Sequence, residues 1–296
     1  MKSYLFFLLF CFSIKLFGQT APEVIPQPDF TTEDIKFTNA GAVLEGTVFK
    51  PKHIDAAVVL VHGSGQETRM VKIASLLAEN GIAVLTYDKR GVGKSGGIYA
   101  GPEVGTNNID SANLKLLALD ASVAARALST FLPNSKVPIG LMGFSQAGWV
   151  IPVAAKVNNK IKFMVLFSCP VVTTLEQLRF QFYTNGDSKF WDTHTEADAR
   201  KHISSDADRY QFAATDPRDA LSALSIPGLW LFGGRDIQIP VGLSTERLNL
   251  LKTSGKPYQY QLFQKLGHNT SSSKSPETTN FAIQWIKSLG AGTKKK

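Results

Sequence analysis

PIGLMGFSQAG, residues 138–148, is the stretch that decides the fold of this chain. Its first half predicts a buried strand, and the apolar residues that follow it predict the start of a helix. Ser145 lies between the two, flanked by the small residues Gly143 and Ala147. This pattern is typical of a nucleophile elbow, in which a strained turn lifts a serine hydroxyl clear of its neighbours. The usual elbow has glycine two residues after the serine; here Ala147 takes that place and Gly148 follows, a mild departure.

Two further residues complete a candidate catalytic group. Asp236 ends the apolar stretch that begins at Leu229, and His268 lies in a loop after the predicted strand Tyr258–Phe263. A serine hydroxyl is a poor nucleophile at neutral pH, so it needs an imidazole to take its proton and a carboxylate to fix the tautomer of that imidazole. All three residues follow predicted strands, at the edge where open α/β sheets bind ligands. Ser145 is therefore predicted as nucleophile, Asp236 as acid and His268 as base.

A glycine-containing loop upstream predicts an oxyanion hole. HGSG at 62–65 follows the apolar strand 57–61. Glycines there let backbone N–H groups turn toward a developing oxyanion, and each preorganised donor is worth ~3–4 kcal/mol. The expected donors are the N–H groups of Gln146 and Ser64, with Gly65 as the next choice for the second donor.

With these motifs in place, the chain resembles the α/β-hydrolase superfamily, and within it the secreted bacterial serine esterases and acyl-peptidase-related hydrolases. The resemblance runs from about Ile35 to Leu289 and implies the same nucleophile, acid and base. It does not fix the substrate, because this fold hosts many chemistries. Five blocks carry it in the expected order: HGSG at 62–65, DKRGVGKS at 88–95, GFSQAG at 143–148, GGRD at 233–236 and GH at 267–268.

The fold class predicted from the rest of the chain is α/β, with a doubly wound, mostly parallel sheet. Residues 35–50 suggest a hairpin that turns at 39–41, and strands then alternate with helices, which is typical of such a sheet. Residues 33–170 and 223–290 are assigned to this core. The predicted strands are Val58–Val61, Ala83–Tyr87, Val137–Met142 and Phe163–Ser168, and the predicted helices include Met70–Asn80, Asn113–Leu132 and Phe281–Leu289.

Residues 171–222 interrupt the alternation. The segment has helical character and no apolar strand, and it is longer than one strand–helix return needs, so it predicts an inserted helical lid. We expect most of its aromatic side chains to pack the lid onto the sheet, and one or two of them to line an acyl pocket and tune chain-length preference. These aromatics are Phe180, Phe182, Tyr183, Phe190, Trp191, Tyr210 and Phe212.

The first 18 residues have a basic start and a short apolar core, typical of a secretory signal peptide cleaved near Gly18. They predict an exported protein, periplasmic or extracellular, with no stable membrane span in the mature chain. Residues 19–32 suggest a linker and 291–296 a basic tail. Without the signal peptide the chain keeps 30 basic and 24 acidic residues, and this mild excess does not indicate a nucleic-acid partner. Cys169 lies in an apolar run and is expected to be a buried thiol.

Other motifs in the chain are typical of functions other than serine hydrolysis. GVGKSG at 91–96 matches the dinucleotide pattern GxGxxG, but the glycines of that pattern must open a helix, and GIYAGP follows here. The favoured interpretation is a tight structural turn, with Asp88 and Arg90 fixing the loop near the site. His62 is expected to be structural. Asp206, Asp208, Asp216 and Asp219 are rival acids, and His53, His194 and His202 lack metal-ligand spacing.

The sequence thus predicts a serine hydrolase that cleaves a small-molecule ester through an acyl-enzyme, without metal or cofactor. A peptidase, a thioesterase or an acyltransferase would use the same residues. A non-catalytic ligand-binding relative and an oxidoreductase are the alternatives from other classes.

Overall fold

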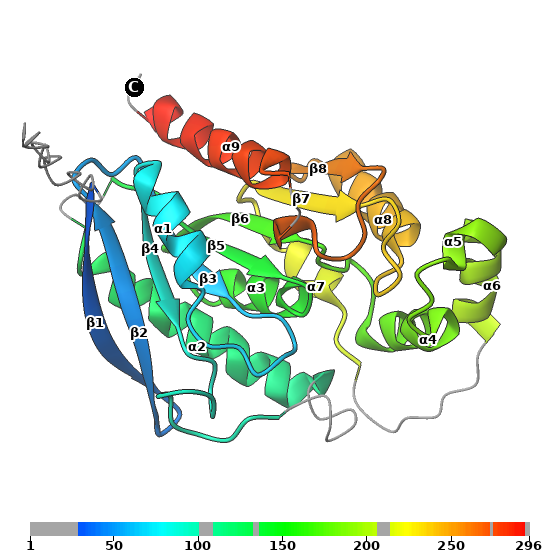
Figure 1. The fold of residues 1–296 in the computed structure, drawn as a ribbon, viewed down its shortest axis with the longest axis horizontal. Coiled ribbons are helices and arrows are strands. Elements are labelled where there is room, and N and C mark those ends of the chain that lie inside the picture. The colour runs from blue at the N-terminus through cyan, green and yellow to red at the C-terminus, as the bar shows by residue number, and fades with distance from the viewer. Residues whose placement is uncertain (1–28, 101–108, 133–135, 206–213, 273–274, 294–296) are drawn as a thin grey trace, which may run out of the picture.

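A twisted eight-stranded sheet runs through the molecule in the order β1-β2-β4-β3-β5-β6-β7-β8 (Figure 1). The computed structural model describes residues 29–100, 109–132, 136–205, 214–272 and 275–293. β1 and β2 form an antiparallel hairpin, β2 pairs antiparallel with β4, and β3 to β8 are parallel. The strands are β1 (Phe30–Asn39), β2 (Ala42–Pro51), β3 (Ala56–Val61), β4 (Ile82–Tyr87), β5 (Ile139–Phe144), β6 (Ile161–Phe167), β7 (Gly228–Gly233) and β8 (Tyr258–Phe263).

Helices cover both faces of this sheet. α2 (Ser111–Ser129), α3 (Ala147–Lys156) and α8 (Val241–Thr253) contribute to the apolar core on one face. α1 (Val71–Glu79) and α9 (Glu277–Thr293) contribute to the core on the other. Because the central strands are covered on both sides, they are apolar throughout, and every residue of β3 is buried. The doubly wound, mostly parallel α/β sheet predicted from the sequence is confirmed.

Two predicted boundaries are wrong. β1 begins at Phe30, so residues 30–32, predicted as linker, are the start of a strand. Their side chains are mostly exposed, which hides the strand in the sequence, but Phe30 pairs with Pro51 and its ring lies 5.6 Å from that of Phe49. At the other end α9 continues to Thr293, so 291–293 are helical and not a loose tail. The predicted signal peptide, residues 19–28 of the predicted linker and residues 294–296 of the predicted tail lie outside the described residues.

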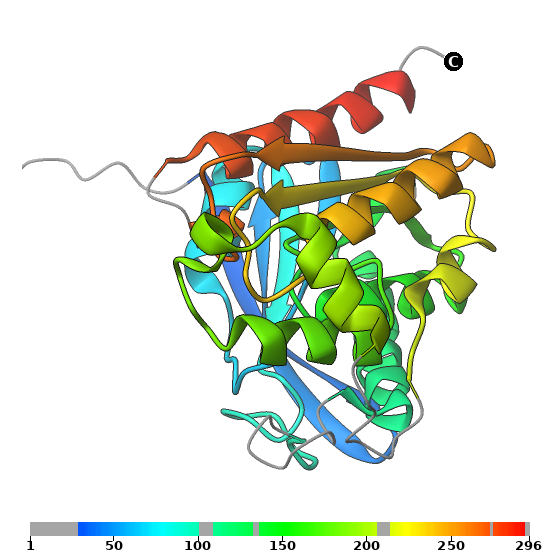
Figure 2. The ribbon, with the colours of Figure 1, turned by 90° about the vertical axis from the view of Figure 1, so that its right-hand side faces the viewer.

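Among the described residues, the segment between β6 and β7 contains helices and no strand. It contains α4 (Thr174–Thr184), α5 (Phe190–Thr193), α6 (Glu196–Ser205) and α7 (Pro217–Leu221). α4, α5 and α6 lie beyond the carboxyl ends of the strands (Figure 1) and stand in front of the sheet when the molecule is seen from that side (Figure 2). Its aromatic side chains pack on one another, with Phe180 and Phe190 fully buried. Tyr210 and Phe212 lie outside the described residues.

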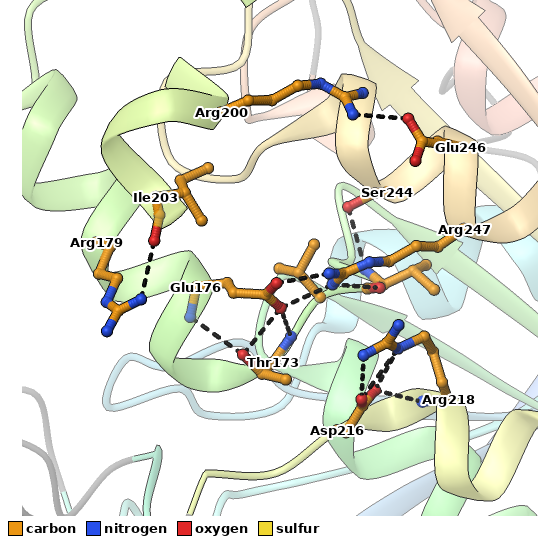
Figure 3. A network of polar contacts seen from close by, with 12 residues as sticks. Thr173, Glu176, Arg179, Arg200, Ile203, Asp216, Arg218, Ser244, Glu246 and Arg247 are labelled. Carbon is orange, nitrogen blue, oxygen red and sulfur yellow. Dashed lines mark hydrogen bonds and ion pairs between the residues drawn. The ribbon is translucent and has the colours of Figure 1, made fainter. Parts of the chain in front are cut away.

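A polar network ties this helical segment to α8 (Figure 3). Thr173 and Glu176 form a capping box at the start of α4. The Glu176 carboxylate also accepts two hydrogen bonds from Arg247 on α8, at 2.7 and 2.5 Å. A second, more exposed pair joins Arg200 of α6 to Glu246 of α8 at 2.6 Å. The segment is therefore held to the core by charge-assisted hydrogen bonds as well as by apolar contacts.

We expect Glu176→Gln to lower the free energy of unfolding at pH 7 by about 1–3 kcal/mol, because it leaves Arg247 without its bidentate partner. Burial by itself raises the pKa of Glu176, but the hydrogen bonds from Arg247 and Thr173 outweigh it and lower this pKa to about 2. The ionised carboxylate therefore stabilises the fold above its usual pKa near 4.5, and this contribution is lost as the pH falls toward 2.

Urea denaturation at pH 7 and at about pH 3 measures the effect, and the deficit of the variant is expected to shrink at the lower pH. Glu246→Gln is the matched control, because an exposed ion pair contributes about 0–1 kcal/mol. An equal loss in both variants, or a Glu176→Gln deficit that does not depend on pH, would contradict the assignment.

Candidate active site

Ser145 occupies a strained turn between β5 and α3. Its φ of +50° lies in the left-handed region, which non-glycine residues rarely adopt. The packing requires small neighbours: a Cβ on Gly143 would lie 2.4 Å from the Cβ of Ala147, and one on Gly148 would lie 2.8 Å from Pro170. Ala147 is tolerated because residue 143 carries no side chain. The turn is thus the expected elbow, and the unusual order Ala147-Gly148 has a steric explanation.

The structure brings together the three residues that the sequence singled out. His268 Nε2 lies 3.0 Å from Ser145 Oγ, and His268 Nδ1 lies 2.8 Å from Asp236 Oδ2. The other carboxylate oxygen of Asp236 accepts the backbone N–H groups of Gln238 and Ile239, at 2.7 and 3.1 Å. With Nδ1 protonated toward Asp236, the lone pair of Nε2 faces the serine hydroxyl. This is the geometry in which an imidazole takes a proton from serine.

The loops that carry Asp236 and His268 approach each other closely. A Cβ on Gly233 would lie 2.2 Å from the carbonyl oxygen of Gly267, so only glycine fits there. The Arg235 N–H then donates to the Leu266 carbonyl at 2.8 Å, which joins the two loops. The glycine pair before Asp236 is therefore a steric requirement for the contact between the carboxylate and the imidazole.

Helices α4 and α5 support the loop that carries the carboxylate. Three side-chain donors meet three successive carbonyls of that loop: Trp191 with Asp236 at 2.8 Å, Thr184 with Ile237 at 2.6 Å and Gln177 with Gln238 at 2.9 Å. Trp191 thus contacts the loop that carries Asp236, here called the acid loop.

The rival acids of the sequence analysis lie apart from this loop or outside the described residues. Asp216 caps α7 and pairs with Arg218 (Figure 3). Asp219 lies in the first turn of the same helix, and Asp206 and Asp208 lie outside the described residues.

A cavity of about 320 Å³ opens beside Ser145 and His268. Its apolar wall is formed by Met70, Ile73, Phe144 and Phe167, and its polar wall includes Ser64, Glu67, Gln238 and Asn269. Among the described residues, none from 171–222 lines it, so the aromatic side chains that the structure describes in that segment do not form the wall next to the serine. The apolar wall comes from α1 and from the ends of β5 and β6.

Of the two expected oxyanion donors, Ser64 lines this cavity, and Gln146 directly follows Ser145, which also lines it. Gln146 is the N-cap residue of α3 and is buried. Ser64 lines the cavity, and its backbone N–H has no acceptor among the residues that the structure describes.

Two charged residues at the site were missed by the sequence analysis. Lys89 is buried, and its ammonium donates to the carbonyl of Gly63 at 2.6 Å and to Oε1 of Gln146 at 3.1 Å. Glu67 accepts the N–H of Gly63 at 3.2 Å, and burial raises its pKa. Both lie in stretches that resemble surface loops, and the only signal was the position of Lys89 two residues after the end of a buried strand.

The remaining motif residues are structural. His62 contacts the carbonyl of Tyr87 at 2.6 Å, and burial lowers its pKa to about 3, so it is neutral at physiological pH. Asp88 accepts the N–H groups of Arg69 and Lys94, both at 3.0 Å, as expected for a turn holder. Arg90 instead forms a buried ion pair with Asp120 of α2.

The glycine-rich run 91–96 forms this turn, and no helix opens from it within the described residues. Cys169 is a buried thiol, and burial raises its pKa. In the part of the chain that the structure describes, no cluster of His, Cys, Asp and Glu could hold a metal ion, and no helix has the length and apolar character needed to cross a bilayer.

Residues 52–218 match the family model described as serine aminopeptidase, S33, which is more than half of the chain. This protein belongs to the serine aminopeptidase S33 family. The family identifies it as a serine hydrolase with an α/β-hydrolase fold, related to esterases and peptidases. The matched segment includes Ser145 and the loop 62–65 and ends before Asp236. A search of curated proteins finds no match.

Solved structures of the same fold include esterases and a peptidase. The esterase Pf2001 of Pyrococcus furiosus has a TM-score of 0.61 and 19% identity, over 87% of this chain and 89% of that one. The acylaminoacyl peptidase of Pyrococcus horikoshii has a TM-score of 0.62 and 17% identity over 88% of this chain, which spans 41% of the peptidase. Acetyl xylan esterase 1 of a Thermoanaerobacterium species has a TM-score of 0.59 and 16% identity, over 90% and 86% of the two chains. At these identities the likeness establishes the fold.

Proposed function

We propose that this S33-family protein hydrolyses carboxylic esters through an acyl-enzyme on Ser145, with His268 as the base and Asp236 as the residue that orients it. The observation that carries the proposal is the chain of contacts from Asp236 to His268 to Ser145, at 2.8 and 3.0 Å. Such a chain activates a serine hydroxyl that is otherwise a weak nucleophile.

Two half-reactions follow from this geometry. Ser145 Oγ attacks the ester carbonyl while its proton passes to His268 Nε2, and the resulting imidazolium is stabilised by the Asp236 carboxylate. The tetrahedral oxyanion is bound by the N–H groups of Gln146 and Ser64. His268 then protonates the departing alkoxide, which leaves as an alcohol. Water, deprotonated by His268, attacks the acyl-enzyme, and the acid is released with Ser145 restored.

Peptide hydrolysis is the second candidate. The family is described as a serine aminopeptidase, and the carboxyl group of Glu67 lines the cavity next to Ser145, where it could bind the ammonium group of a peptide N-terminus. Aminoacyl p-nitroanilides with a free and with an acetylated amino group, compared with p-nitrophenyl esters, distinguish the two activities. An ester hydrolase cleaves the esters in preference to both anilides, whereas an aminopeptidase cleaves the free-amine anilide and rejects its acetylated form.

A fluorophosphonate is expected to add once to the wild-type protein and not to Ser145→Ala, as measured by intact mass. Ser145→Ala and His268→Ala are each expected to lower kcat by ~10³-fold or more, and the double variant by little more, because the residues act as a unit. An adduct that survives Ser145→Ala refutes the assignment of the nucleophile.

The acyl pocket is proposed to lie between α1 and the strand ends. Shortening its apolar wall by Ile73→Ala enlarges the space for an acyl chain. We expect kcat/KM for hexanoyl esters to rise relative to that for acetyl esters by about sixfold to tenfold, at the lower end of the ~1–3 kcal/mol that a methylene-scale change provides.

Phe182→Ala is the matched control, because Phe182 is 54% exposed and does not line the cavity. A flat chain-length profile for Ile73→Ala together with a shifted profile for Phe182→Ala or Trp191→Ala would assign specificity to the segment 171–222 instead.

Export is proposed from the sequence pattern of residues 1–18, which lie outside the described residues. N-terminal sequencing of the protein from its native host is expected to start near Gln19. Intact Met1 in a soluble cytoplasmic fraction would contradict this.

A further inference from the structure

Three successive carbonyls of the loop 63–65 are held by two side chains. The ammonium of Lys89 donates to the carbonyl of Gly63 at 2.6 Å and to that of Gly65 at 3.3 Å. The hydroxyl of Tyr99 donates to the carbonyl of Ser64 at 2.8 Å. These carbonyls belong to the loop that supplies one of the two proposed oxyanion donors, so their directions matter for binding the oxyanion.

Because the peptide bond is planar, the hydrogen bond from Lys89 to the carbonyl of Gly63 also fixes the direction of the N–H of Ser64. The carbonyl of Gly63 and the N–H of Ser64 belong to one peptide unit, and no cis peptide bond occurs among the described residues. In a trans peptide the N–H and the C=O point in opposite directions. Fixing the carbonyl of Gly63 on Lys89 therefore directs the N–H of Ser64 away from the ammonium, and a charged hydrogen-bond donor on the carbonyl also polarises the unit and strengthens its N–H as a donor.

The same ammonium reaches the other side of the proposed oxyanion site. Lys89 Nζ donates to Oε1 of Gln146 at 3.1 Å, and Gln146 is the residue that follows the nucleophile. One buried cation thus joins the peptide that carries the N–H of Ser64 to the residue that carries the second N–H. The backbone supports the arrangement, because the N–H of Lys89 donates to the carbonyl of Glu67 at 3.0 Å.

We propose that Lys89 is a positioning residue for the oxyanion hole: its ammonium fixes and polarises the Gly63–Ser64 peptide and holds Gln146, so that both N–H groups are directed at the oxyanion. The proposal rests on the proposed function of Ser145. Lys89 acts through the Gly63–Ser64 peptide and the side-chain amide of Gln146, not on the substrate.

The charge of Lys89 makes this role sensitive to pH. Burial lowers its pKa to about 8, against a smaller opposing effect of Glu67. The other titratable groups around it, among the described residues, are His62, Asp88 and Tyr99, whose ring lies 5.5 Å from the ammonium. The ammonium is present below about pH 8 and lost above it, so the oxyanion site is expected to weaken as the pH rises through this value.

The test measures kcat and KM for a p-nitrophenyl ester from pH 6 to 10 in the wild type, Lys89→Met and Lys89→Arg. Lys94→Met is the control, because Lys94 is an exposed lysine in the same turn. Lys89→Met is expected to lower kcat by about 10–100-fold with KM little changed, since the loss of one whole oxyanion donor costs about 10²–10³. The wild type and Lys94→Met lose activity above about pH 8, and Lys89→Met does not.

Lys89→Arg keeps a permanent positive charge and tests the proposal even if Lys89→Met fails to fold. In Lys89→Arg the loss of kcat at alkaline pH is expected to move to higher pH than in the wild type. The proposal is overturned if Lys89→Met retains the wild-type kcat, if either Lys89 variant keeps the wild-type loss of kcat at alkaline pH, or if the wild-type rate stays level to pH 10. Fluorophosphonate labelling separates the two ideas. A wild-type protein that takes no adduct overturns the proposed function and the role of Lys89 with it, whereas a labelled, active wild type with unchanged Lys89 variants overturns only the role of Lys89.

Discussion

The left-handed turn at Ser145 is the constraint on which the rest of the site depends. The strand β5 must end and the helix α3 must begin within two residues, which forces a φ of +50° on the serine. That strain is retained only where the surrounding structure fixes it. Gly143, Ala147 and Gly148 leave the room, and the neighbouring strand fixes the backbone, because the N–H of Ser145 donates to the carbonyl of Phe167 at 3.0 Å. The hydroxyl is thereby presented at the carboxyl edge of the sheet.

The loops around Ser145 are held in place by two separate sets of contacts. In the first set, the missing Cβ of Gly233 lets the loop of Asp236 contact the loop of His268, and side-chain donors from α4 and α5 bind the carbonyls of the Asp236 loop. In the second set, Lys89 and Tyr99 donate to the carbonyls of the loop 63–65. The contacts of α4 and α5 give the segment 171–222 a structural role that does not depend on substrate, because they fix the loop that carries Asp236.

The sequence was sufficient for features that leave a local signature. Sterics and periodicity explain why Ser145 lies between small residues, why two glycines precede Asp236 and why a strand comes before each of these residues. The fold and the proximity of Ser145, Asp236 and His268 could therefore be predicted. The role of Lys89 could not, because a lysine in a polar turn normally lies in water and only the tertiary structure buries it. The apolar wall of the cavity could not be predicted from the sequence either, since Ile73 of α1 and Phe167 of β6 line the same cavity only in the folded chain. The start of β1 was hidden because an exposed edge strand has little apolar pattern.

The most direct measurement is the capture of the covalent intermediate during turnover. A slowly deacylated p-nitrophenyl ester is mixed with the protein, the reaction is quenched in acid within the first turnover, and the digested protein is mapped by mass spectrometry. We expect a burst of about one p-nitrophenolate per protein molecule and the mass of the acyl group on the peptide that contains Ser145. A burst with the acyl group on another residue, or turnover without any acylated peptide, would contradict the assignment of Ser145 as the nucleophile.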